Sequence, residues 1–440
     1  MTETADGTTP RAGLAALLHA ARLDPSVRIR NVDLLAVLVA VLLPWTTSGL
    51  GIAMAIWIVA VLFTLDAQAF LRSLTRPASA LPLAFFALVV VGTLWADASW
   101  SARLRGINPA MKLLAIPFLL YHFERSQRGV WVLAAFIVSC ALLMVLSCIV
   151  AFEPGWRLGS AVTRGIAVKN YLDQSQEFTF CLFALALPTL WLIQQKRFAL
   201  AAGCAVLMLG FFANMIFVVT GRTALVCVPV LLALFAVRQL SIRTTTILFA
   251  IFSAVVVMTW FASPYLRQRV DDTISDYRHY QQDNMTYQSP SSSVPEYLRN
   301  PTGLRLEYWR KSLKFFGEAP ILGNGTGTIR QLFERDAVGK TDLAAEVVDN
   351  PHNQTLNVAV QWGAAGVILL YAMWLVHLLL FRDHSAAAWI GLLIVVQNFV
   401  SSLFNSHLFD FVEGWMYVLG VGIAGGMALA GKARQSNAPP

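Results

Sequence analysis

The chain has 440 residues, of which 57% are hydrophobic and 13% are charged, and its mean hydropathy is +0.61. Soluble globular proteins carry about 25% charged residues, so this composition excludes a soluble globular protein and indicates a protein of the lipid bilayer. The net charge of +8 comes from basic residues scattered through short polar segments rather than from a basic domain. Membrane phosphates therefore suit this charge better than nucleic acid does.

Apolar runs recur along most of the chain. They lie at residues 32–46, 50–66, 79–96, 108–122, 129–152, 174–194, 197–219, 223–238, 244–262, 357–381, 386–404 and 411–430. Because a transmembrane helix needs roughly 20 mostly apolar residues, we predict an all-α polytopic membrane protein with about twelve transmembrane helices. The polar N-terminal residues precede a run without a small-residue cleavage site, so we expect a retained first helix. The five cysteines lie in apolar runs without metal-ligand spacing.

The distribution of lysine and arginine predicts the orientation. The short loops on the N-terminal side of the predicted bilayer carry more of these residues than the opposite loops, which favours a cytoplasmic N-terminus. The predicted organisation is a cytoplasmic tail at 1–31, helices one to nine at 32–262, a large periplasmic segment at 263–356, helices ten to twelve at 357–430 and a cytoplasmic tail at 431–440. Both termini are then cytoplasmic.

The predicted periplasmic segment combines a linker with an interfacial helix. Residues 281–296 are rich in serine and typical of a mobile linker. After Pro301, apolar residues recur at helical spacing, which predicts an amphipathic helix on the outer membrane face; they are Leu304, Tyr308, Trp309, Leu313 and Phe316. The following Gly323, Gly325 and Gly327 form a GxGxG run, but no strand pattern precedes it, so we interpret it as a turn.

Only three histidines, His279, His352 and His407, lie on the predicted outer side, and His352 has the most informative context. Asn350 is a plausible N-cap with Pro351 at the first helical position, which would place His352 in the first turn of a helix. The positive end of a helix disfavours a protonated imidazole, and a neutral ring can act as a general base. The alternative is a histidine that only caps the helix or anchors it at the interface.

Outer basic residues form a second set. Arg222 follows Thr220 and Gly221 where two apolar runs nearly meet, and Arg305 shares a helix face with Trp309. Two guanidinium groups at the membrane surface suit a diphosphate, and Lys169 could add a third positive charge. The alternative is snorkelling to headgroups or pairing with local carboxylates. The outer acidic residues have no metal-binding spacing, so we expect no metal and no cofactor.

The sequence resembles the O-antigen ligase family, the WaaL group within the O-antigen ligase and polymerase superfamily. The residues that carry the resemblance are Pro351-His352-Asn353-Gln354-Thr355-Leu356 with Gly363 downstream, Thr220-Gly221-Arg222, and Arg305 to Trp309. The resemblance implies a bacterial inner-membrane glycosyltransferase. It would move O-antigen from an undecaprenyl diphosphate donor to a sugar of the lipid A core, without a metal and with inversion of the anomeric centre.

Carried over residue by residue, the resemblance makes His352 the catalytic histidine and Arg222 and Arg305 the arginines that bind the diphosphate, with Lys169 a weaker transfer. The expected partners are the lipid-linked O-antigen, the lipid A core oligosaccharide and membrane lipids, with no nucleic acid. Alternatives within the superfamily are an O-antigen polymerase and a protein O-oligosaccharyltransferase. A lipid or polysaccharide transporter is a rival from another class.

Overall fold

A computed structural model describes residues 25–160, 163–219, 221–262 and 301–436, together with 267–268, 271, 274–275 and 277–278. Every regular element among these residues is a helix, so the expectation of an all-α protein is confirmed. Thr220, His279 and the serine-rich segment 281–296 lie outside the described residues.

The helices follow the apolar runs closely. The first part of the chain forms α2 (Pro25–Leu42), α3 (Thr47–Leu62), α4 (Ala67–Leu74), α5 (Pro77–Val91), α6 (Trp100–Met111), η1 (Lys112–Leu114), α7 (Ala115–Arg125), α8 (Gly129–Phe152) and η2 (Pro154–Trp156). The rest forms α9 (Tyr171–Ala184), α10 (Ala186–Gln194), α11 (Phe198–Phe217), α12 (Arg222–Gln239), α13 (Ile242–Ala262), α15 (Pro301–Glu318), α16 (Ile329–Ala337), η4 (Asp342–Ala345), α17 (Gln354–Leu380), α18 (Ala386–Ser401) and α19 (Phe411–Ser436).

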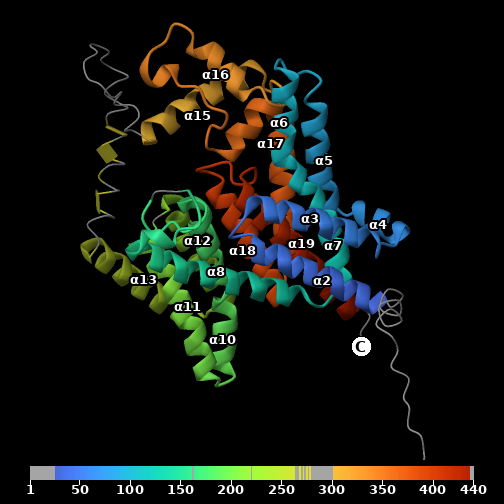
Figure 1. The fold of residues 1–440 in the computed structure, drawn as a ribbon, viewed down its shortest axis with the longest axis vertical. Coiled ribbons are helices and arrows are strands. Elements are labelled where there is room, and N and C mark those ends of the chain that lie inside the picture. Colours follow the sequence, from blue (N-terminus) through green and yellow to red (C-terminus); the bar gives the residue numbers. More distant parts are fainter. Residues whose placement is uncertain are drawn as a thin grey trace, which may run out of the picture.

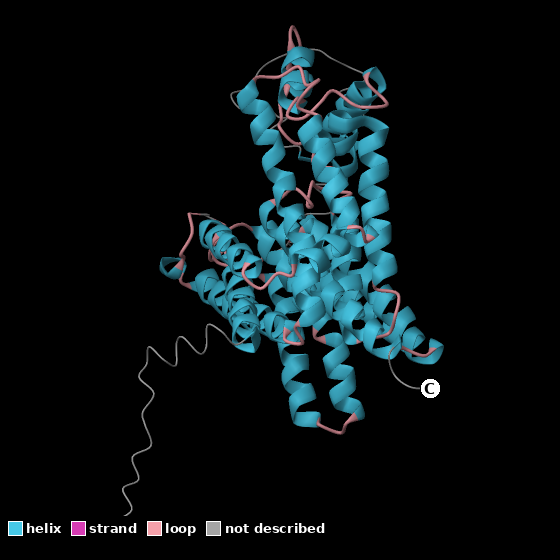
Figure 2. Cartoon of the chain, turned by 90° about the vertical axis from the view of Figure 1, so that its right-hand side faces the viewer, coloured by secondary structure: helices cyan, strands magenta, loops and turns pink. Residues whose placement is uncertain are grey.

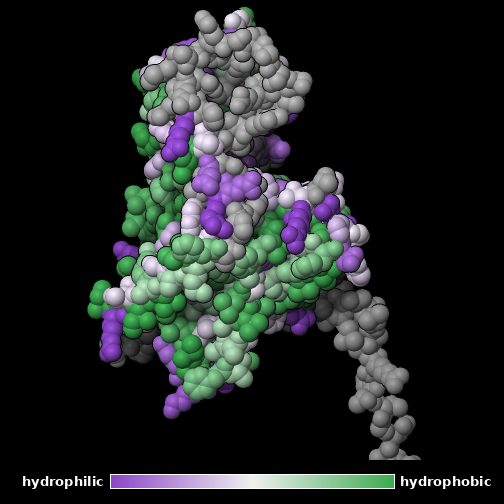
Figure 3. Space-filling model, turned by 90° about the vertical axis from the view of Figure 1, so that its left-hand side faces the viewer, coloured by the Kyte–Doolittle hydropathy of each residue, from purple (hydrophilic) through white to green (hydrophobic). Residues whose placement is uncertain are grey.

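Among the described residues, six helical segments are long and apolar enough to cross a bilayer. They are α8, α9 with α10, α11, α12, α17 and α19. Shorter apolar helices include α5, α18 and part of α13, and α3 with α4 forms a pair bent by 119°. Figure 3 shows a broad hydrophobic surface over this body of helices. The chain is therefore a polytopic membrane protein, and the count of twelve spans stays a prediction.

Residues 301–350, which we call the cap, lie at one end of the molecule. Figures 1 and 2 show α15 and α16 of the cap at the same end as the tips of α5 and α6. Tyr308, Phe315 and Phe333 form a small buried core with Val360 of α17. The predicted amphipathic helix is confirmed as α15, but its buried face differs in detail because Leu313 is 59% exposed and Phe315 is buried.

Helix α17 is broken at Gly363, whose backbone has φ 59° and ψ −156°. The segment around the GxGxG run supplies hydrogen bonds on both sides of the break. The backbone nitrogens of Asn324 and Gly325 donate to the carbonyls of Val360 and Gln361, at 2.9 and 2.8 Å. The nitrogens of Ala364 and Ala365 in turn donate to the carbonyls of Pro320 and Ile321, at 2.8 and 3.1 Å. The cap thus replaces the bonds that the helix loses at its kink.

The GxGxG run is a turn, as expected, and its glycines permit close backbone contact. All three have positive φ, at 66°, 92° and 80°. A Cβ atom on Gly323 would lie 2.4 Å from the backbone of Gln361 and Trp362, and one on Gly327 would lie 2.3 Å from the carbonyl oxygen of Ala102. Only glycine fits these positions, so the run fastens the cap to α17 and α6.

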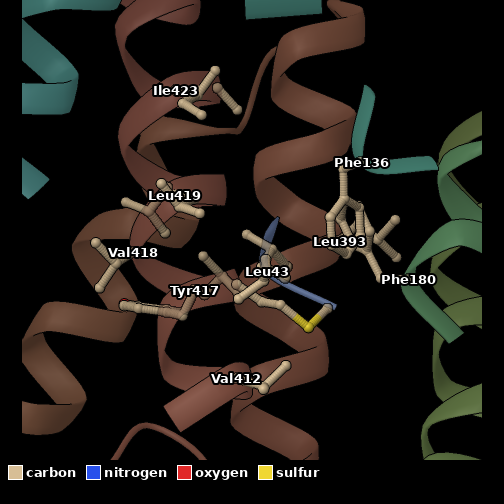
Figure 4. Close-up of a cluster of buried hydrophobic side chains, with 14 of the residues drawn as sticks. Leu43, Phe136, Phe180, Leu393, Val412, Tyr417, Val418, Leu419 and Ile423 are labelled. Carbon is tan, nitrogen blue, oxygen red and sulfur yellow. The ribbon is translucent and has the colours of Figure 1, made fainter. Parts of the chain in front are cut away.

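Below the cap, the helices share one large hydrophobic core. Figure 4 shows part of it, with Phe136 of α8 and Phe180 of α9 beside Leu393 of α18. The rings of Phe136 and Phe180 meet edge to face with centroids 5.7 Å apart. This packing joins α9 to both α8 and α18.

Candidate functional site at the junction of cap and membrane body

His352 lies in the short segment that leads from the cap into α17. The expected N-cap at Asn350 is wrong: α17 begins at Gln354, and Asn353 caps it by accepting from the Leu356 nitrogen at 3.0 Å. Asn350 instead uses its side-chain oxygen to accept from the backbone nitrogen of His352 at 2.9 Å. His352 therefore sits before the helix, in a left-handed conformation with φ 54°. Such strain in a non-glycine residue is typical of functional sites.

The loop between α18 and α19, residues 402–410, holds this segment in place. The Asn353 side chain donates to the Leu403 carbonyl at 2.9 Å, and the Gln354 nitrogen donates to the Ser402 carbonyl at 2.9 Å. The Nδ1 atom of His352 lies 2.7 Å from Oδ1 of Asn405. The imidazole is thus oriented by residues about fifty positions further along the chain.

Helix α15 brings Arg305 beside this histidine. The Trp309 indole donates to the Pro351 carbonyl at 3.1 Å, and the Tyr308 and His352 rings have centroids 6.2 Å apart. Burial lowers the pKa of His352, and the positive charge of Arg305 lowers it further, although the Asn405 hydrogen bond opposes both effects. The neutral imidazole expected from the sequence is therefore favoured. The cause is burial and the charge of Arg305, whereas the sequence had suggested the positive end of a helix.

Arg305 also lies near Arg222, the first residue of α12. Burial lowers the pKa of Arg305, and the charge of Arg222 lowers it again. Arg305 forms no ion pair with any residue that the structure describes. Gly221 packs so tightly on α9 that a Cβ atom there would lie 2.7 Å from Oγ of Ser175. The N-termini of α9 and α12 therefore meet beside two guanidinium groups, which is a favourable environment for an anion.

The structure places Lys169 differently from the two arginines. Its ammonium group donates to the carbonyl of Leu43 at the end of α2 and lies 6.0 Å from the ring centre of Phe411. These contacts direct the side chain toward α2 and α19.

Of the loop at 402–410, only His407 was named from the sequence, and Asn405 and Asp410 were missed. His407, Asp410 and Glu413 place ligand-type atoms within 4.8 Å of one another, a set that could hold a cation. Lys112 already donates to the carbonyls of Phe409 and Asp410, at 3.0 and 2.5 Å. Its ammonium group already places a positive charge beside Asp410 and Glu413, so we assign no metal there. In the sequence, the spacing of three between His407, Asp410 and Glu413 could have indicated that these side chains lie close together.

The fold and this site define an all-α membrane protein with a histidine and two arginines at the junction of its cap and its helical body. Residues 205–371 match the family model described as O-antigen ligase. The matched segment contains Arg222, Arg305 and His352, and its similarity to the O-antigen ligase family agrees with the resemblance described above. The match supports a function of the ligase or polymerase type in O-antigen processing. A comparison with curated proteins finds no match.

Proposed function

We propose that the protein is an O-antigen ligase, a glycosyltransferase that moves O-antigen polysaccharide from undecaprenyl diphosphate to a sugar of the lipid A core. It would act in the bacterial inner membrane, with both termini in the cytoplasm and the cap in the periplasm. The observation that carries this proposal is the position of His352 beside Arg305, which in turn neighbours Arg222. A base next to a cationic site suits transfer of a sugar from a diphosphate to a hydroxyl group.

In the proposed mechanism the two arginines bind the donor diphosphate. Each planar guanidinium group can grip phosphate oxygens in bidentate fashion, and together they stabilise the negative charge that grows on the leaving group. Because the donor is already activated, the reaction needs no nucleotide. Lys169 stays a predicted third contact, although its ammonium group would have to leave the Leu43 carbonyl to reach the phosphates.

His352 would act as the general base. Its Nδ1 atom is occupied by Asn405, which leaves Nε2 to accept the proton of the acceptor hydroxyl. The hydroxyl oxygen attacks the anomeric carbon as the bond to the diphosphate oxygen breaks, and the proton moves to Nε2. Attack from the face opposite the leaving group inverts the anomeric centre.

Purified protein, lipid-linked O-antigen and lipid A core, with nothing else added, provide the test. The proposal predicts transfer that persists in EDTA. Activity that disappears with EDTA and returns with a divalent ion would contradict the metal-free mechanism. If the product were a longer lipid-linked glycan, the protein would be a polymerase; transfer to a protein would indicate an oligosaccharyltransferase. Movement of glycan lipid across vesicle membranes without any transfer would favour the transporter.

A further inference from the structure

Asn405 connects His352 to a carboxylate. Its Oδ1 atom lies 2.7 Å from Nδ1 of His352, and its Nδ2 atom donates to Oδ2 of Asp410 at 2.9 Å. Asn405 is 5% exposed, so water does not compete freely for these bonds. The three side chains form one hydrogen-bonded row that leads from the imidazole toward the start of α19.

The direction of each bond in this row follows from the chemistry of Asp410. Burial and the neighbouring Glu413 raise the pKa of Asp410 to about 6, so its carboxylate is ionised at neutral pH. An ionised carboxylate only accepts hydrogen bonds. The amide nitrogen of Asn405 must therefore face Asp410, and its oxygen must face His352. An amide oxygen cannot donate, so the proton of a neutral His352 must sit on Nδ1.

We propose that Asn405 is a positioning residue that holds neutral His352 in its Nδ1–H tautomer, with Asp410 fixing the orientation of the Asn405 amide. The lone pair of Nε2 is then always available to the acceptor hydroxyl. This inference rests on the proposed role of His352 as the base. It assigns a function to a loop outside the segment that matches the O-antigen ligase family, which ends at residue 371.

The other groups around His352 do not fix its tautomer. Arg305 and Tyr308 face it from α15, and His407 faces it from the same loop as Asn405. The positive charge of Arg305 and that of a protonated His407 lower the pKa of His352 but favour neither nitrogen through a hydrogen bond. Asn405 makes the hydrogen bond that distinguishes Nδ1 from Nε2 among the described residues.

The chain offers a rescue experiment. Asn405→Ala should lower kcat about 100-fold, because a base in the wrong tautomer cannot accept the proton, while KM for the donor lipid stays the same. The acid limb of the pH profile should move to lower pH, because the Asn405 hydrogen bond raises the pKa of His352 in the wild type and its loss lowers that pKa. The double variant Asn405→Asp with Asp410→Asn exchanges amide and carboxylate. Residue 405 still accepts from Nδ1–H of His352, while the amide now at position 410 donates to the carboxylate at 405, so that only this second bond reverses its direction. This double variant should recover most of the activity, with the acid limb moved to higher pH.

The tautomer can be observed without any turnover. Selective ¹⁵N-histidine labelling distinguishes the two ring nitrogens, and the His352 signals are those that vanish in His352→Gln. We expect Nδ1–H in the wild type and in the exchange variant, and a mixture in Asn405→Ala. An Nε2–H tautomer in the wild type, or Asn405→Ala with an unchanged pH profile, would overturn the proposal. An Nδ1–H signal in a protein that transfers no glycan would instead refute the proposed function and leave the tautomer assignment standing.

Discussion

The indole nitrogen of Trp309 donates a hydrogen bond of 3.1 Å to the carbonyl of Pro351. This contact joins the helix that carries Arg305 to the residue immediately before His352. The cap and the entrance to α17 therefore hold the arginine and the histidine at a fixed separation, although the two residues lie 47 positions apart in the sequence. A cap that shifted relative to the membrane body would separate the base from the cationic site.

Trp309→Phe removes this hydrogen bond and keeps most of the packing. We expect the free energy of unfolding to fall by about 1 kcal/mol. We also expect kcat to fall about 5-fold, because His352 and the bound diphosphate are no longer held at a fixed separation. Thermal unfolding in detergent and transfer kinetics measure the two effects. Trp191→Phe on α10, where the side chain is 52% exposed, is the control and should change neither quantity.

Arg305→Ala should weaken binding of the donor lipid and should change the free energy of unfolding only slightly. Loss of one bidentate guanidinium contact should raise KM for the donor lipid by 10-fold or more, since charged hydrogen bonds contribute about 1.5 to 3 kcal/mol. Arg305→Lys should restore only part of the affinity, because an ammonium group cannot grip two oxygens in a plane. Arg330→Ala removes an equal charge from an exposed site on α16 that pairs with Glu334 and Asp349. Equal effects at both sites would argue against a specific diphosphate contact.

The pH dependence of transfer should report His352. A general base is inactive when protonated, so kcat/KM should fall as the pH drops through the pKa of His352. Burial and Arg305 hold that pKa below the ordinary value of 6.5, and the acid limb should therefore lie below pH 6.5. Arg305→Gln removes the positive neighbour and should move the limb upward. An acid limb at the same pH in this variant would show that the charge of Arg305 does not influence the pKa of His352.

Gly363→Ala should destabilise the protein strongly. The backbone at this position is one that L-residues rarely adopt, and a Cβ atom would lie 2.4 Å from the carbonyl oxygen of Ile321. We expect a loss of about 3 kcal/mol together with loosening of the cap from α17. Gly203→Ala on α11 has no atom within 4 Å of the new Cβ and should leave the unfolding temperature unchanged or slightly higher.

Local patterns were enough to predict the helices and the turn at the GxGxG run, because each depends on residues close together in the sequence. The break in α17 could not be predicted, since Gly363 is tolerated there only because the backbone at 320–325 supplies the missing hydrogen bonds. The choice of Asn353 over Asn350 as N-cap has a similar cause. Both are good capping residues, and the contact of Asn350 with Ser406, at 2.6 Å, comes from a distant loop.

The residues hydrogen-bonded in a row with His352 could likewise not be predicted from a single sequence. Asn405 and Asp410 have ordinary neighbours and match no motif, and only the packing of α18 and α19 against α17 brings their loop to the histidine. Lys169 is the opposite case, a residue that was predicted at the site but makes its contacts elsewhere. The sequence suggested that Lys169 adds a third positive charge to the outer arginines, but its ammonium group instead donates to the carbonyl of Leu43 at the end of α2.

Transfer by purified His352→Gln tests the central claim most directly. Glutamine can still accept or donate hydrogen bonds at this position but cannot take up a proton at neutral pH, so the donor should bind normally while transfer falls by at least about 100-fold. Transfer at the wild-type rate by a folded His352→Gln protein, with donor affinity unchanged, would contradict the account.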